Sequence, residues 1–116
     1  MLPAAVRIFV CTEPQDMRRS FDGLAAATRA VLGKDPQSGA LFAFVNKRKN
    51  RVKVLWWDRN GYCLLYKRLH RALFWIPSAR DGDDNASIRI DGRELARLLE
   101  GVSKETRTQS LTQDLE

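Results

Sequence analysis

Basic and aromatic side chains gather in the middle of this 116-residue chain. These residue types bind phosphate groups and stack on nucleic-acid bases. The densest group is the run Lys47-Arg48-Lys49-Asn50-Arg51, which carries four positive charges within five residues. On a turn between two strands, such a run can follow a phosphate backbone or enter a groove of a nucleic acid. The alternative interpretation is a solvated turn that serves solubility alone.

Three further groups extend this candidate surface. Arg18-Arg19 can split its roles, one arginine pairing with Asp16 or Asp22 and the other binding phosphate. A second basic cluster lies around residues 67–71, and basic and aromatic side chains over residues 53–68 resemble a stacking-and-phosphate platform. The complete set of expected nucleic-acid contacts is Arg18, Arg19, Lys47, Arg48, Lys49, Arg51, Lys53, Trp57, Tyr66, Lys67, Arg68 and Arg71.

Catalytic chemistry is poorly supported by the remaining polar residues. A nuclease or strand-transfer site needs two or three carboxylates around divalent ions. Of the four candidates, Asp16 and Asp22 lie near arginines at a predicted helix start, where capping and ion pairing are the ordinary roles. Asp35 and Asp58 lie in predicted turns, where aspartate is common for backbone reasons. A metal-dependent nuclease subunit therefore remains the least favoured function.

Other sites for cofactors or metals are also not expected. The sequence has no glycine-rich phosphate loop, nucleophile elbow or paired metal-binding histidines. Cys11, Cys63 and His70 are too few for a structural zinc site, and a disulfide between the two cysteines stays open. We expect no catalytic residues, no metal and no cofactor.

The charge is unevenly distributed along the chain. Residues 1–77 hold 14 Lys and Arg against 5 Asp and Glu, a net charge of +9, whereas residues 78–116 hold 6 against 9, a net charge of −3. A basic body favours a polyanionic partner, most simply nucleic acid. No run of about 18 apolar residues occurs, so no membrane span is expected. Two cysteines fit a reduced, cytoplasmic protein.

Hydrophobic periodicity predicts the elements that position these residues. The fold class is α+β, a small antiparallel β-meander sheet with one long and one short helix packed on it. The expected domain covers residues 1–102, and residues 103–116 are expected to be a disordered polar tail. Strands are predicted over residues 6–11, 41–45, 52–57, 62–69 and 87–90, a long helix over 21–32, and a short helix after a cap at Asp91.

The pair Asn60-Gly61 predicts the register of the central hairpin. If these residues form a two-residue turn, Trp57 faces Leu64 and Lys53 faces Arg68. One face of the hairpin then carries basic and aromatic residues and reads as an exposed surface, while the opposite face reads as core. The alternatives are that Trp57 is packed in the core and that Lys53 and Arg68 fan out into water.

Several motifs together resemble a known family. Asp16-Met17-Arg18-Arg19, followed by Phe21-Asp22-Gly23-Leu24, resembles the opening signature of the accessory TnpB proteins of IS66-type bacterial insertion sequences. The resemblance spans residues 4 to about 102, with departures at Ser20 and His70, where such sequences often have Gly and Glu. It continues through Asp35-Pro36, Ser38-Gly39, Leu41-Phe42, residues 53–58, Gly61, Lys67-Arg68-Leu69 and Phe74-Trp75-Ile76-Pro77.

The resemblance implies a protein that is needed for transposition alongside a separate catalytic transposase. It is unrelated to the RNA-guided nuclease that shares the name TnpB, and it carries over no catalytic residues or cofactor. We therefore expect a non-enzymatic accessory protein of the cytoplasm and nucleoid that binds DNA at the element ends and assists the transposase. The alternative is an adaptor that binds the transposase through the strand at residues 87–90 or the leucine-rich helix and contacts DNA little. The oligomeric state stays open.

Overall fold

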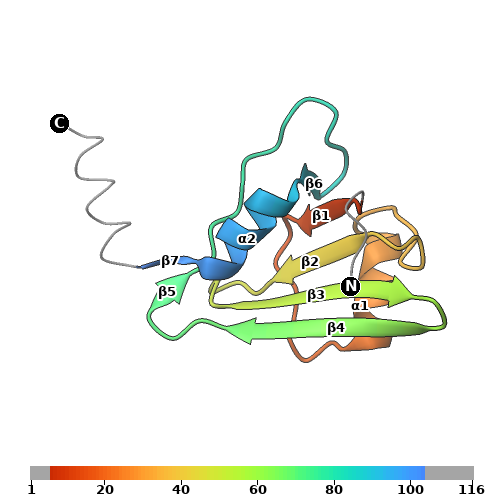
Figure 1. Cartoon of the computed structure of the whole chain (residues 1–116), viewed down its shortest axis with the longest axis horizontal. Helices are drawn as coiled ribbons and strands as arrows, with labels where there is room; N and C mark the ends of the chain where they lie inside the picture. The colour runs from red at the N-terminus through yellow and green to blue at the C-terminus, as the bar shows by residue number, and fades with distance from the viewer. Residues whose placement is uncertain (1–5, 104–116) are drawn as a thin grey trace.

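A five-stranded sheet with one helix on each face forms the body of the protein (Figure 1). The computed structural model describes residues 6–103. The strand order is β4-β3-β2-β1-β6, and β5 and β7 pair separately as a two-stranded ribbon. The elements are β1 Ile8–Cys11, α1 Phe21–Ala30, β2 Leu41–Val45, β3 Arg51–Asp58, β4 Gly61–Arg68, β5 Ala72–Leu73, β6 Ser87–Ile90, α2 Gly92–Glu100 and β7 Val102–Ser103.

The predicted α+β class holds, but the sheet is not wholly antiparallel. The meander β2-β3-β4 is antiparallel, as its two turn signals predict. Strand β1, in contrast, pairs in parallel with β2 and antiparallel with β6. A parallel pair needs a crossover connection, which α1 supplies between β1 and β2. The sheet is therefore mixed, with one parallel pair.

Alternating side chains give the sheet a hydrophobic core on each face. In β1, Ile8 and Val10 face the core that α2 covers, while Phe9 and Cys11 face the core that α1 covers. All four residues are buried, since the strand lies inside the sheet with helices on both sides. On the β3–β4 hairpin, the face expected to be exposed carries the buried Lys53 and Leu55 as well as the exposed Tyr66, so that expectation holds only in part.

The two helices are nearly equal in length, at 10 and 9 residues, so the predicted contrast between a long and a short helix is not confirmed. Helix α1 starts after Ser20 as predicted but ends at Ala30, two residues early. Helix α2 starts at its predicted cap, where the Asp91 side chain accepts the Glu94 N–H and Glu94 accepts the Asp91 N–H. No helix of the described part of the chain is long and apolar enough to cross a membrane.

The C-terminal boundary of the folded part lies slightly beyond the predicted one. Ser103 belongs to β7 and pairs with Ala72, so it is not part of a disordered tail. Gly101 makes this strand possible, since its backbone has φ of 77° and ψ of 175°, a region almost restricted to glycine. A Cβ at this position would lie 2.6 Å from Leu69 Cδ1. The expected tail over residues 104–116 lies outside the described residues.

The register of the β3–β4 hairpin differs from the predicted one by two residues. Asp58 pairs with Gly61, so Arg59 and Asn60 are the turn residues, and Arg59 adopts the positive φ of 59°. Trp57 lies opposite Tyr62 instead of Leu64, and the two rings meet edge to face with centroids 4.9 Å apart. Cross-strand aromatic contacts of this kind stabilise a register. An even shift leaves each side chain on its predicted face but changes its partners.

Candidate nucleic-acid interface

The turn between β2 and β3, residues 46–51, is held in shape from inside; we call it the basic turn. The Asn46 side-chain oxygen accepts the backbone N–H groups of Asn50 and Arg51, at 3.0 and 2.9 Å. The Asn46 side-chain nitrogen donates to the Asn50 side-chain oxygen at 2.7 Å. Two asparagines thus fill the inside of the turn. Lys47, Arg48 and Lys49 are left exposed at its tip, as the sequence predicts.

A second set of hydrogen bonds fastens the basic turn to the segment that follows β4. Leu69 N–H donates to the Asn50 carbonyl, and Phe74 N–H donates to the Lys49 carbonyl, both at 2.7 Å. Leu69 and Phe74 are buried in the core beneath α2. The tip therefore projects from a fixed base. This attachment was not predicted from the sequence, where the apolar run Phe74-Trp75-Ile76 before Pro77 is the available signal for it.

A hollow of about 360 Å³ on one side of the basic turn unites two groups that are distant in the sequence; we call it the first hollow. The segment before α1 reaches it because Gln15 N–H donates to the Val45 carbonyl at the end of β2. Arg18 and the basic turn thus face one space, with four positive charges against one carboxylate. The lining residues are Gln15, Asp16, Met17, Arg18, Asn46, Lys47, Arg48 and Arg51.

Arg18 is the member of the Arg18-Arg19 pair that forms an internal ion pair. Its Nε and Nη2 donate to the Asp16 carboxylate at 2.9 and 2.6 Å, while its side chain stays 92% exposed. These hydrogen bonds lower the pKa of Asp16 to about 2. The Arg19 side chain instead contacts Gln15 Oε1 at 3.3 Å. Arg18 therefore presents a guanidinium whose position Asp16 already fixes.

The Asp16–Arg18 pair makes a direct prediction for the titration of Asp16. We expect an NMR titration to place its midpoint near 2, and Arg18→Gln to move it up toward the ordinary value of 3.8. Because the pKa is lower in the folded state, the pair stabilises the fold above about pH 4 and loses this effect as pH falls toward 2. A midpoint that Arg18→Gln leaves unchanged would show that Arg18 does not hold the carboxylate.

Lys53 is a structural residue, which corrects its predicted role as a phosphate contact. It is only 6% exposed, and its Nζ donates to the Arg19 carbonyl at 2.8 Å. The same Nζ lies 4.7 Å from the centroid of the Tyr66 ring, a favourable cation–π contact. The Tyr66 hydroxyl in turn accepts a hydrogen bond from Arg51 Nη1 at 2.8 Å. This chain of contacts ties the Arg18-bearing segment to the sheet.

The predicted stacking platform is not assembled. Trp57 is half-buried against Tyr62 near the β3–β4 turn, while Arg68 lies opposite Arg51 at the other end of the hairpin. Only Tyr66, with 48% of its surface exposed, offers an accessible ring there. The platform residues lie on one face of the hairpin but at different positions along its strands, so they do not form one surface.

Lys67 and Arg68 point to opposite faces of the sheet, so they do not form one cluster. Lys67 Nζ donates to the Leu99 carbonyl in the last turn of α2, at 2.6 Å. A cation is stabilising at that helix end. Arg68 shares its face with Arg51, next to the basic turn, because consecutive residues of a strand alternate between faces. Of these two predicted contacts, Arg68 alone lies near the first hollow.

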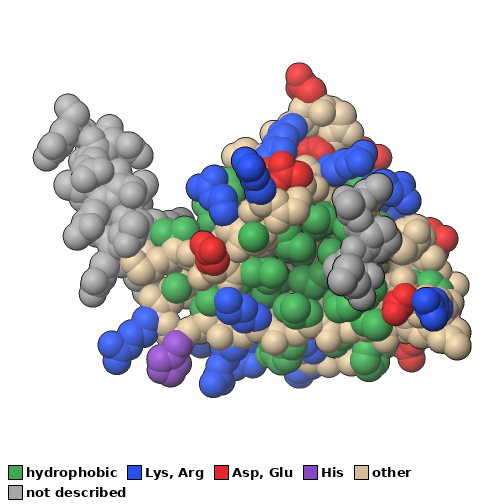
Figure 2. Space-filling model, viewed as in Figure 1, with side chains coloured by type: hydrophobic (Ala, Val, Ile, Leu, Met, Phe, Trp, Pro, Cys, Tyr) green, Lys and Arg blue, Asp and Glu red, His purple; other side chains and the backbone are tan. Residues whose placement is uncertain are grey.

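A second hollow, of about 400 Å³, adjoins the basic turn and is lined on its outer side by residues that follow β4. Arg48 lines both hollows, and His70 brings an imidazole from the bend after β4. Arg71 is exposed in the same bend. Figure 2 shows Lys and Arg side chains gathered along the β4 edge and at its end near β5. The second hollow is lined by Arg48, Asn50, His70, Ala72 and Leu73.

The carboxylates and thiols do not converge on a possible metal ion. Within residues 6–103, no group of three or more His, Cys, Asp or Glu side chains could hold one. Asp35 accepts the Gln37 N–H at 2.9 Å, the turn role expected for it. Cys11 and Cys63 are free thiols, and burial raises the pKa of Cys11.

Comparison with known proteins identifies the family. Residues 6–109 match the family described as "IS66 Orf2 like protein". The chain belongs to this family. Membership confirms the resemblance seen in the motifs and links the chain to an accessory role in the transposition of an insertion sequence.

Two relatives come from Sinorhizobium fredii (strain NBRC 101917 / NGR234), and both are named uncharacterized proteins. The protein y4hO is 39% identical over 104 residues, which cover 88% of this chain and 87% of y4hO. The protein y4jC is 34% identical over 97 residues, which cover 84% of this chain and 80% of y4jC. No solved structure matches the chain.

Proposed function

We propose that this chain is a non-enzymatic accessory protein for transposition, which binds DNA at the ends of the insertion sequence and assists a separate transposase. Family membership supplies the link to transposition. The observation that carries the DNA-binding part is the first hollow, where the exposed basic turn and Arg18 face one space. Basic side chains on a projecting turn are the usual means of contacting phosphate.

The basic turn is well prepared for such contacts. Within residues 6–103, the side chains of Lys47 and Arg48 take part in no ion pair, and both are exposed. The backbone beneath them is fixed by Asn46 and by the bonds from Leu69 and Phe74. A preorganised loop loses less conformational entropy when it binds. The basic turn can therefore contact a phosphate backbone with little loss of conformational entropy.

The test is a fluorescence-anisotropy titration at several salt concentrations. The probes are a labelled element-end duplex, a scrambled duplex of equal length and the corresponding single strand. With four to five phosphate contacts, the affinity for duplex should fall with salt at a log–log slope of about −4. Tighter binding of the element-end duplex than of the scrambled duplex would establish recognition of the ends. No binding to any probe at low salt would contradict DNA binding.

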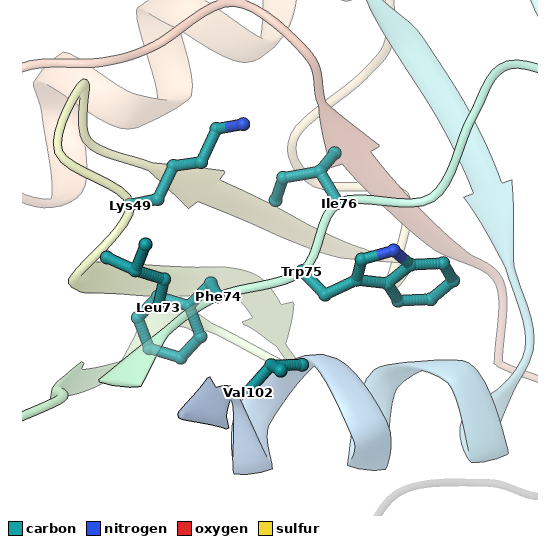
Figure 3. Close-up of a pocket in the computed structure, with 6 residues that line it drawn as sticks. All are labelled: Lys49, Leu73, Phe74, Trp75, Ile76 and Val102. Atoms are coloured by element: carbon teal, nitrogen blue, oxygen red, sulfur yellow. The ribbon is translucent and has the colours of Figure 1, made fainter. Parts of the chain in front are cut away.

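The second candidate function is an adaptor for the transposase, and an exposed patch beside the basic turn favours it. Trp75 is 43% exposed, and Arg97 of α2 lies 5.4 Å from the centroid of its ring. The neighbouring hollow of about 330 Å³ is shown in Figure 3, with Lys49 reaching from the basic turn and Val102 contributed by β7. An adaptor would keep binding the transposase after charge reversal of the basic turn and lose it in Trp75→Ala.

A further inference from the structure

We propose that the DNA partner is double-stranded, and that the basic turn enters a groove so that the hollows on its two sides each face one phosphate backbone. This inference rests on the proposed DNA-binding function and deepens it. It adds the second hollow, with His70 and Arg71, to the interface, and it assigns different strands to Arg18 and Arg71.

The first step is the ridge-like form of the basic turn. Arg48 lines both hollows while their other lining residues all differ, and from this we infer that the turn lies between two adjacent spaces. Their outer walls come from different parts of the chain. Residues 15–18 before α1 form one wall, and His70, Ala72 and Leu73 after β4 form the other. The projecting end of the β2–β3 hairpin, with a hollow on each side, is complementary in shape to a groove of duplex DNA, which lies between two phosphate backbones.

The second step is the charge on each side of the ridge. Arg18, Lys47 and Arg51 line the first hollow, where Asp16 is the only acidic lining residue within residues 6–103. His70 lines the second hollow, and Arg71 is exposed beside it. Both sides can therefore donate hydrogen bonds to phosphate oxygens. The major groove of B-DNA admits a two-stranded β-ribbon, so the end of the β2–β3 hairpin is an element of suitable size.

The third step concerns the alternative, a single strand. Proteins that bind single strands stack the bases on exposed aromatic rings beside a basic groove. Here Trp57 is packed against Tyr62, and Lys53 is buried under the Arg19 carbonyl. Tyr66 is then the one predicted platform ring that stays exposed on the hairpin face, and a single ring does not make the row of stacking surfaces on which successive bases of a single strand bind. A single strand also has one backbone, which would occupy one hollow and leave the other unused.

The experiment uses the full chain with three test variants, one control variant and two probes. Arg18→Gln removes a charge from the first side, Arg71→Gln removes one from the second, and the two are also combined. Arg93→Gln is the matched control, since Arg93 is exposed at the start of α2, the helix end away from the basic turn. The probes are an element-end duplex and one of its strands, each titrated by anisotropy at several salt concentrations. Thermal unfolding verifies that the variants fold.

On the duplex, each single variant should bind about five- to tenfold more weakly and lower the magnitude of the salt slope by about 1. In the double variant the two fold-changes in affinity should multiply and the two changes in salt slope should add. Arg93→Gln should bind like the parent protein. On the single strand, only one of the two variants should have an effect.

Two results would overturn the inference while DNA binding stands. One is a duplex affinity that Arg71→Gln leaves unchanged, which would make the interface one-sided. The other is equal sensitivity of both probes to both variants, which would mean that one backbone contacts both hollows. Absence of binding to every probe would instead overturn the proposed function itself.

Discussion

Reversing the charge of Lys47 and Arg48 together, with Lys47→Glu and Arg48→Glu, is expected to lower the affinity for duplex DNA about 100-fold or more. Each side chain would form a charge-assisted contact with phosphate, and such contacts are worth about 1.5–3 kcal/mol each. The salt slope should fall by about 2 in magnitude, since two phosphate contacts are lost. This is the largest effect that we expect on DNA binding from two substitutions.

The fold should tolerate this change. Both side chains are exposed at the tip, and the hydrogen bonds that shape the turn come from Asn46, Leu69 and Phe74 instead. Surface substitutions away from such features usually change the free energy of unfolding by less than about 0.5 kcal/mol. Denaturant unfolding of the double variant checks this directly.

The matched control is the double variant Arg59→Glu and Arg93→Glu. It changes the net charge of the chain by the same four units, and both arginines are exposed. Arg59 lies in the turn at the opposite end of β3, so the control also reverses a charge on a hairpin tip. An equal loss of affinity in the control would mean that DNA responds to net charge and that the basic turn is not the contact. Transposase pull-down should be the same for both double variants.

Local signals predicted most elements of the fold. The meander, the start of α1 and the capping box of α2 each depend on residues within about ten positions of one another, and all three are present. The exposed tip of the basic turn was predicted for the same reason. A turn between two strands keeps its charged side chains in water because burial of unpaired charge is costly.

The errors concern pairings between distant segments. The parallel pairing of β1 with β2 depends on how α1 packs on the sheet, which hydrophobic periodicity does not encode. Lys53 looked like a surface cation, yet its partner is the carbonyl of Arg19, 34 positions earlier. The hairpin register depends on which two residues form the turn. The predicted turn was Asn60-Gly61, whereas Arg59 and Asn60 form it in the structure and Arg59 has the positive φ. Sequence pattern alone could not decide between these two turns.

The structure separates basic side chains that serve the fold from those that face solvent beside the basic turn. Lys53 holds the segment before α1, Lys67 contacts the last turn of α2, and Arg80 pairs with Glu94 near its first turn. The net charge of the chain therefore overstates the number of basic side chains that are free to contact DNA. The useful charge is concentrated at one end of the sheet, around the two hollows. Variants placed there test function, while variants of Lys53 or Lys67 would mainly test stability.

The segment after β4 links this surface to the core, and Phe74→Ala should reveal the link. Phe74 is 2% exposed in the core beneath α2, so its removal should lower the free energy of unfolding by about 3–5 kcal/mol. Trp75→Ala is the adjacent control. Its ring is 43% exposed and contacts Arg97, so a loss of about 1 kcal/mol or less is expected. Denaturant unfolding of the two variants measures both values.

Phe74→Ala should also loosen the basic turn at temperatures where the variant is still folded. The amides of Leu69 and Phe74 donate to carbonyls of the turn, so their hydrogen exchange should accelerate more than that of Leu24 in α1. DNA affinity should then fall several-fold, although no cation has been removed, because the turn must be ordered on binding. If Phe74→Ala and Trp75→Ala lose the same stability and bind DNA equally well, Asn46 alone shapes the turn. The attachment to the core would then have no part in DNA binding.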